Sequence, residues 1–318
     1  MKKLQREDIQ ILSSHSDMTE QELNQLLKEN VYNDKEMWKK FLQLFFITLG
    51  IGFTTAGIIF FFAYNWADLN KFIKLGIVEI LVIATTIIAL LPKISENNRN
   101  IILTGVSFLV GVLFAVFGQI YQTGADAYDF FLAWTLFIAL WVIVSNFPPL
   151  WLFFIVLINT TFILYTQQVA KDWDEILIAT SLLIFNSAML IATLIIHKKK
   201  QDLNIPIWFT HILALGCVVF ATVGMMGVIF DNFKPLSTPF VCTVLVIYAL
   251  GIWHGIESKS GFYLSVIPFS LIIMISAFLI NLSTDGGMFL LVSFFIIGSV
   301  TLVIMNLINL QKKWKNEN

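Results

Sequence analysis

Residues 41–64 read FLQLFFITLGIGFTTAGIIFFFAY and contain no charged side chain. A helix of about 20 apolar residues crosses the roughly 30 Å hydrocarbon core of a bilayer, so this stretch predicts a transmembrane helix. Further apolar runs of similar length follow it, separated by short polar breaks, at 72–91, 101–119, 130–146, 150–166, 176–196, 206–230, 238–253, 262–281 and 287–308. The sequence therefore predicts an all-α fold, a polytopic transmembrane helical bundle of about ten spans.

The composition agrees with a membrane protein and excludes several partners. Of the 318 residues, 58% are hydrophobic and only 13% are charged, which lies outside the range of soluble domains. The net charge is −1 and no basic stripe lies outside the short loops, so nucleic acid is not expected as a partner. The lipid bilayer is the expected partner.

The loop charges predict an orientation with both termini in the cytoplasm. In that topology sixteen of the 20 Lys and Arg residues lie in inside segments, and only Lys71, Lys74, Lys171 and Lys234 lie outside. This split obeys the positive-inside rule and fits an even number of spans. We expect a cytoplasmic N-terminal helical segment over 1–40, a transmembrane domain over 41–310 and a short cytoplasmic basic tail over 311–318.

The N-terminal segment carries a helix-start signal. Thr19 followed by Glu22 matches a capping box, and Leu23, Leu26 and Leu27 repeat at helical spacing behind it. A short cytoplasmic helix is predicted, either as half of a hairpin that leans on the membrane domain or a partner, or as an amphipathic segment on the lipid surface. No apolar core of a signal peptide precedes residue 41, so the first span is expected to direct insertion.

The break between the fourth and fifth spans reads SNFPP, residues 145–149. Two consecutive prolines forbid a continuous helix, so a tight cytoplasmic reversal is predicted. Both flanking apolar runs are short. A re-entrant pair that does not fully cross the membrane is the alternative.

The most distinctive polar segment joins the third and fourth spans and reads GQIYQTGADAYDF, residues 118–130. It is expected to face the outside, where its carboxylates, amides and aromatic rings suit a cation, an amine or a sugar. The candidate ligand-binding residues are Gln119, Tyr121, Gln122, Thr123, Asp126, Asp129 and Trp134. The alternative is that Asp126 caps the next helix, Trp134 anchors it at the headgroups and the glutamines satisfy the loop backbone.

Glu79 is the second candidate site residue. It lies near mid-depth of the second span, where a carboxylate is costly and is expected to face the bundle interior. Asn159 and Asn186 reach similar depth, so an intramembrane polar cluster of these three residues is predicted. The alternative is a protonated, structural Glu79 that bonds a neighbouring helix.

The run GQIYQTGAD at 118–126, together with FFFAYNW at 60–66, resembles an uncharacterised family of bacterial membrane proteins, domain of unknown function 2157. The resemblance extends over roughly residues 8–150. It implies a multi-pass protein of the bacterial cytoplasmic (inner) membrane but no activity. Family members are often encoded near a second multi-pass protein and a membrane-anchored protein with a Gly-Asp-Tyr motif, which implies partner proteins in an envelope complex.

Three classes of function remain open. The chain has no motif typical of a catalytic centre, a metal site or a phosphate-binding loop, and no cofactor or catalytic residue is expected. Glu79 and the outer polar segment favour a carrier, or a protein that handles a lipid or small molecule. The family context and the short loops favour a non-catalytic integral-membrane subunit of an envelope complex. An enzyme is the least expected class, because the loops offer few residues on which to build a site.

Overall fold

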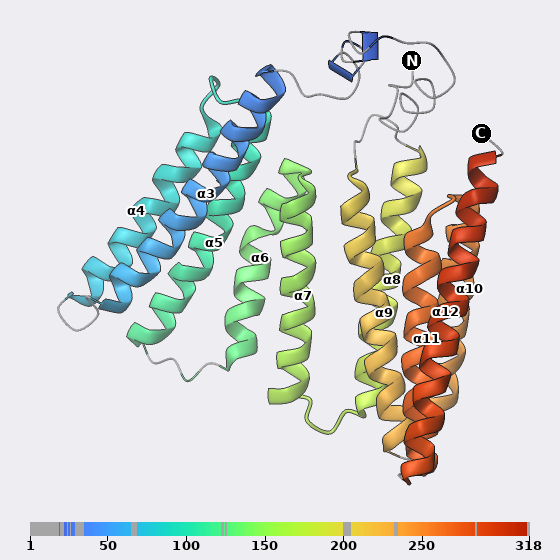
Figure 1. The fold of residues 1–318 in the computed structure, drawn as a ribbon. Coiled ribbons are helices and arrows are strands. Elements are labelled where there is room, and N and C mark those ends of the chain that lie inside the picture. Colours follow the sequence, from blue (N-terminus) through green and yellow to red (C-terminus); the bar gives the residue numbers. More distant parts are fainter. Residues whose placement is uncertain are drawn as a thin grey trace. The chain divides into compact units, whose positions relative to one another are not determined.

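The chain folds into long helices of the length and polarity that its apolar runs predict (Figure 1). The computed structural model describes residues 19, 22–23, 25, 27–28, 35–64, 69–121, 124, 126–199, 205–231, 235–283 and 285–316. Within these residues the helices are α3 Lys35–Tyr64, α4 Lys71–Leu90, α5 Glu96–Tyr121, α6 Ala127–Ser145, α7 Pro148–Gln168, α8 Glu175–Lys199, α9 Ile207–Phe230, α10 Ser237–Glu257, α11 Gly261–Leu282 and α12 Gly286–Asn316. All ten are long and apolar enough to span a membrane, which confirms the predicted all-α class and gives ten candidate spans among the described residues.

The predicted reversal between α6 and α7 is present. Asn146 ends α6 in the left-handed conformation (φ 46°, ψ 38°), and the two prolines occupy the first two positions of α7. Proline is favoured there because the first helical N–H groups have no partner within the helix. The two helices have 19 and 21 residues, enough to cross a bilayer core at about 1.5 Å per residue, and full crossing by this pair stays a prediction.

The predicted capping box is also present. The backbone N–H and the hydroxyl of Thr19 both donate to Glu22 Oε2 at 3.0 Å, and the Glu22 N–H donates back to Thr19 Oγ1 at 3.4 Å. Leu26, and most of the predicted 1–40 segment, lies outside the described residues.

The chain divides into two compact units. The first comprises residues 1–124 and 143–145 and contains α3, α4 and α5. Val78 of α4 and Val116 of α5 form the centre of its apolar core. A Cβ added to Gly105 of α5 would lie 2.5 Å from Ile51 Cγ2, so α3 approaches α5 closely at a residue without a side chain.

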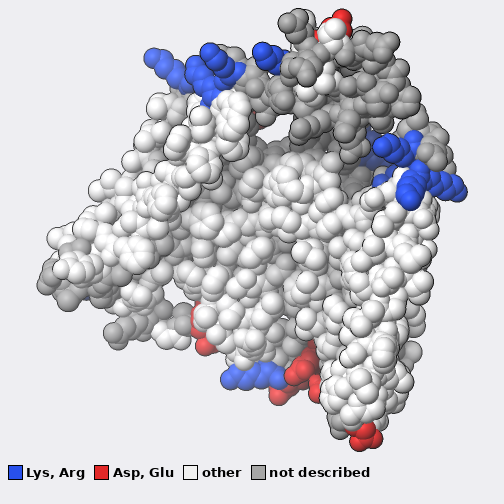
Figure 2. Space-filling view, in the orientation of Figure 1, with Lys and Arg blue, Asp and Glu red and all other residues white. Residues whose placement is uncertain are grey.

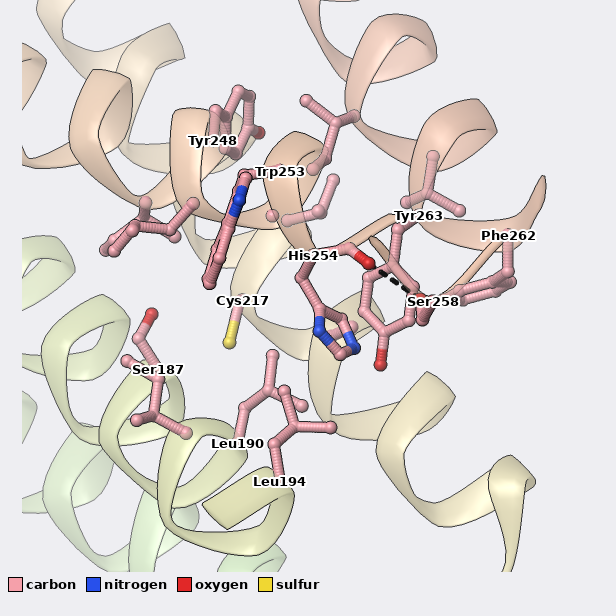
Figure 3. Close-up of a pocket in the computed structure, with 18 of the residues that line it drawn as sticks. Ser187, Leu190, Leu194, Cys217, Tyr248, Trp253, His254, Ser258, Phe262 and Tyr263 are labelled. Atoms are coloured by element: carbon pink, nitrogen blue, oxygen red, sulfur yellow. Dashed lines mark hydrogen bonds between the residues drawn. The ribbon is translucent and has the colours of Figure 1, made fainter. Parts of the chain in front are cut away.

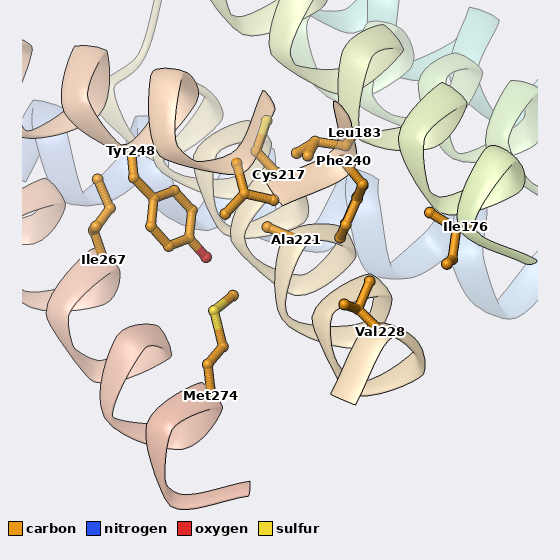
Figure 4. Packing of buried hydrophobic residues seen from close by; sticks show 10 residues of the cluster. Ile176, Leu183, Cys217, Ala221, Val228, Phe240, Tyr248, Ile267 and Met274 are labelled. Carbon is orange, nitrogen blue, oxygen red and sulfur yellow. The ribbon is translucent and has the colours of Figure 1, made fainter. Parts of the chain in front are cut away.

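The second unit comprises residues 125–142 and 146–318 and contains α6 to α12. Its buried core lies among α8, α9, α10 and α11 (Figure 4). The fully buried Phe240, near the start of α10, packs in this core with Ala179, near the start of α8. Gly224 of α9 faces both, since an added Cβ would lie 2.8 Å from Ala179 Cβ and would collide with the Phe240 ring. These three residues pack α8, α9 and α10 tightly at the end where α8 and α10 begin.

Candidate functional site

The two ends of the second unit carry opposite charge. Helices in this unit alternate in direction, so α8, α10 and α12 finish at the same end, and this basic end is defined by Lys198, Lys199, Lys259, Lys312, Lys313 and Lys315. The opposite, acidic end carries Asp126, Asp129, Asp172, Asp174, Glu175, Asp231 and Asp285, together with Lys171. Figure 2 shows this separation, with blue side chains at one end of the unit and mostly red ones at the other.

A cavity of about 520 Å³ opens at the basic end, between α8, α9, α10 and α11 (Figure 3). Its wall is mainly aliphatic and aromatic. The lining residues are Ser187, Leu190, Ile191, Leu194, Ile195, His197, Lys198, Ala214, Cys217, Val218, Ile247, Tyr248, Leu250, Gly251, Trp253, His254, Glu257, Ser258, Phe262, Tyr263, Val266 and Ile267. The volume lies within the roughly 300–1,000 Å³ that small-molecule sites occupy.

The rim of the cavity is polar because its helices end there. Lys198 Nζ, in the last turn of α8, lies 3.8 Å from Glu257 Oε1 at the end of α10. Both side chains are exposed, 84% and 51%, so this ion pair contributes little to the stability of the rim. His254 packs edge-on against the Tyr263 ring with centroids 5.0 Å apart. The rim therefore offers cationic and hydrogen-bonding groups above an apolar interior.

Two buried hydroxyls of the wall lack a hydrogen-bond partner among the residues that the structure describes. They are Tyr263 Oη and Ser187 Oγ, on residues that are only 6% exposed. Thr210 neighbours Tyr263, and Cys217 neighbours Ser187, but neither neighbour meets hydrogen-bond geometry. Figure 3 shows the Tyr263 hydroxyl beside the His254 ring. An unpaired buried hydroxyl is costly, so these two groups are candidates for binding an added polar molecule.

A third hydroxyl of the wall, that of Tyr248, is satisfied within the protein. Its oxygen lies 2.6 Å from Ser270 Oγ, and Ser270 Oγ lies 2.7 Å from Thr222 Oγ1. The Thr222 hydroxyl also donates to the Val218 carbonyl. This chain of hydroxyls joins α9, α10 and α11 behind the cavity, and it stabilises the wall.

An apolar interior with a polar rim suits an amphipathic ligand. The described residues contain no group of three His, Cys, Asp or Glu side chains able to hold a metal ion.

The predicted outer polar segment is divided between the two units. Gln119 and Tyr121 are exposed at the end of α5 in the first unit, and Gln122 and Thr123 lie outside the described residues. The remaining three members, Asp126, Asp129 and Trp134, belong to the second unit. A common ligand site for all seven stays a prediction.

The start of α6 is capped differently from the sequence-based alternative. Asp126 occupies the N-cap position, but its side chain makes no capping hydrogen bond. Gln168 of α7 supplies the acceptor, since the Tyr128 N–H donates to Gln168 Oε1 at 2.9 Å. Trp134 packs edge-on against Phe153 of α7, with ring centroids 5.4 Å apart, so it contributes to the contact between the two helices.

Two of the three predicted intramembrane polar residues, Asn159 and Asn186, are hydrogen-bonded to each other. Asn159 Nδ2 donates to Asn186 Oδ1 at 3.1 Å, and Asn186 Nδ2 donates to Asn159 Oδ1 at 2.8 Å. Glu79 lies in the first unit, on a face of α4 that is exposed within that unit. Its place beside the asparagines stays a prediction.

Sequence reasoning missed the cavity. His197 and His254 read as ordinary groups at helix ends, and Tyr263 reads as one aromatic residue among many. The available signal was the presence of cationic or imidazole side chains in the last turns of both α8 and α10. That signal does not reveal the space between the two helices.

Comparison with known protein families gives a match to the first part of the chain. Residues 15–151 match the family described as predicted membrane protein (DUF2157). The match contains the GQIYQTGAD run and confirms the resemblance inferred from it. The DUF2157 match covers α3 to α6 and the first residues of α7, so the α8–α11 cavity lies beyond it. No curated protein and no solved structure matches the chain.

Proposed function

We propose that the protein is a carrier of the bacterial inner membrane that binds and moves a small amphipathic molecule through the α8–α11 cavity. The observation that supports this function is the cavity itself, which combines an apolar interior with a polar rim at one end of the spans. Apolar cavities in proteins bind apolar ligands, and the aliphatic and aromatic wall of this cavity suits the apolar part of such a molecule. The proposed orientation places the basic end in the cytoplasm, in keeping with the positive-inside rule.

Transfer of a fluorescent single-chain lipid between the leaflets of proteoliposomes tests the carrier function. Leu194 faces the cavity (Figure 3) and Leu194→Trp fills part of it, whereas Leu245→Trp adds the same bulk on the exposed face of α10. We expect the wild type and Leu245→Trp to accelerate transfer, and Leu194→Trp to be slower while folding normally. Transfer by the wild type at the rate of protein-free vesicles would exclude this function.

A second candidate is a non-catalytic subunit of an envelope complex, and the exposure of Glu79 within its unit favours it. A carboxylate in hydrocarbon costs about 2–3 kcal/mol on insertion scales, so a partner protein that covers this face of α4 would lower that cost. The native size of the solubilised protein tests this function. A complex larger than one chain that dissociates in Glu79→Leu would support it, and an unchanged size would count against it.

A further inference from the structure

We propose that the occupant of the cavity is an anionic single-chain amphiphile, whose carboxylate or phosphate head lies at the rim and whose tail fills the interior. This inference rests on the proposed binding function and adds the chemical class of the ligand. It comes from three features of the cavity: a side opening, a cationic rim and an unpaired buried hydroxyl.

The cavity opens sideways between α8 and α10. Four of its lining residues, Ile191, Ile195, Leu250 and Trp253, are also 44–63% exposed on the outer surface. In a membrane such apolar side chains contact lipid, so a tail can enter from the bilayer without crossing water. The volume of about 520 Å³ fits one small ligand, so one tail is expected inside.

The rim favours a negative head. Lys198 supplies a positive charge, and Tyr263 supplies a buried hydroxyl that has no hydrogen-bond partner within the described part of the chain. The 22-residue helix α11 begins beside Tyr263, with no acidic residue in its first turn and no side-chain cap, so its N–H groups and dipole also favour an anion.

Two features oppose an anion at the rim. Glu257 carries a negative charge, and the carbonyl ends of α8 and α10 lie there as well. Basic residues in the last turns of α8 and α10 offset the partial negative charge of these helix ends. The other lysines of the basic end leave the net charge there positive. Removing the Glu257 charge should therefore strengthen binding of an anion, a result that a purely apolar site would not give.

The test uses dibrominated single-chain probes, because bromine quenches tryptophan fluorescence on contact and Trp253 lines the cavity. The full-length protein is placed in nanodiscs of zwitterionic lipid. Each probe is titrated against the wild type and against Trp253→Phe, and the difference isolates Trp253 from the other tryptophans. The probes are stearate, a monoacyl phosphatidylglycerol and a monoacyl phosphatidylcholine. The first two separate a carboxylate from a phosphate head, and the third is the zwitterionic control.

We expect saturable quenching by the anionic probes at lower concentration than by the zwitterionic one. Lys198→Gln should weaken anionic binding about threefold or more, and Glu257→Gln should strengthen it. Lys199→Gln is the matched control, since Lys199 lies at the same end but does not line the cavity, and it should have little effect. Tyr263→Phe should weaken binding of the anionic probes without unfolding the protein.

The quenching titrations distinguish a failure of the anionic-head inference from a failure of the proposed function. Equal binding of all three probes, with no change in Lys198→Gln or Glu257→Gln, would overturn the anionic head while leaving an amphiphile site intact. No saturable quenching of Trp253 by any probe would overturn both this inference and the proposed function. Melting curves of each variant identify any loss that comes from misfolding.

Discussion

Asn159 and Asn186 join α7 to α8 through a reciprocal pair of amide hydrogen bonds, 3.1 Å and 2.8 Å long. Their second amide protons go to backbone carbonyls of their own helices, those of Ile155 at 3.0 Å and Leu182 at 2.8 Å. All four amide N–H groups are therefore satisfied inside the protein. This arrangement favours a structural clamp over a ligand site.

Single replacement of either asparagine should destabilise the protein. Asn186→Leu leaves the Asn159 amide without its partner, and we expect a loss of about 1–2 kcal/mol in unfolding free energy. Asn159→Leu should cost a similar amount. The double variant should cost clearly less than the sum, because no amide is then left unpaired. Additive losses in the double-mutant cycle would show that the two amides are not coupled.

Gly224 gives a second test of packing, with a matched control on the same helix. Gly224→Ala would force Phe240 and Ala179 apart, and overpacking of this kind costs about 1–3 kcal/mol. An added Cβ on Gly227 meets no atom of the described residues within 4 Å, so Gly227→Ala should be neutral or should stabilise by up to about 1 kcal/mol. Thermal melting in detergent compares the two variants. Equal effects would contradict the close approach of α8, α9 and α10.

The features that sequence predicted correctly depend on short-range physics. The length and polarity of each apolar run predict a span. The two prolines at 148 and 149 predict the start of a helix, and the Thr19–Glu22 spacing predicts the N-terminal cap of an earlier one. Each involves residues within one or two turns. The similar depth of Asn159 and Asn186 was also readable, because depth follows from position along a span.

The features that sequence did not predict depend on how separate helices lie together. The cavity requires that α8 and α10 pack at Phe240 and leave space at Lys198 and Glu257, and no local pattern encodes that divergence. Gln168 could not be recognised as the cap of α6, because it lies 40 residues from Tyr128 in sequence. Such relations are set by side-chain packing across helices.

The orientation can be tested at the two ends of the second unit. In a background where Cys217 and Cys242 are replaced by Ala, Asp172→Cys at the acidic end should react with an impermeant thiol reagent in intact cells. Lys199→Cys at the basic end should react only after the cells are permeabilised, because the positive-inside rule places this end in the cytoplasm. The reverse labelling pattern would contradict the proposed orientation.

Tyr263 and Tyr248 provide a matched pair of hydroxyl deletions. The Tyr248 hydroxyl lies 2.6 Å from Ser270 Oγ, so Tyr248→Phe should lower the unfolding free energy by about 1 kcal/mol. The Tyr263 hydroxyl has no partner among the described side chains and backbone groups, so Tyr263→Phe should be neutral or slightly stabilising in the absence of ligand. Melting of the delipidated protein measures both. A loss for Tyr263→Phe as large as that for Tyr248→Phe would reveal a protein partner for the Tyr263 hydroxyl.

The Thr19–Glu22 capping box predicts a pH dependence of the N-terminal helix. The Thr19 backbone N–H, and then the Thr19 hydroxyl, hold the pKa of the Glu22 carboxyl below its ordinary value near 4.5. Because the folded-state pKa is the lower one, the stabilisation is complete above the ordinary value and is lost as the pH falls through the folded pKa. Helicity of a peptide covering residues 15–34, followed by circular dichroism, should therefore decrease on acidification.

The variant Glu22→Gln separates this titration from that of the other acidic residues in the peptide. Glutamine keeps an oxygen that can accept from Thr19 but cannot be protonated in this range. Its helicity should change less than that of the wild type between neutral and acidic pH. Thr19→Ala removes the hydroxyl and should lower helicity at neutral pH. Identical pH profiles for the wild type and Glu22→Gln would show that the Glu22 carboxylate does not stabilise the start of this helix.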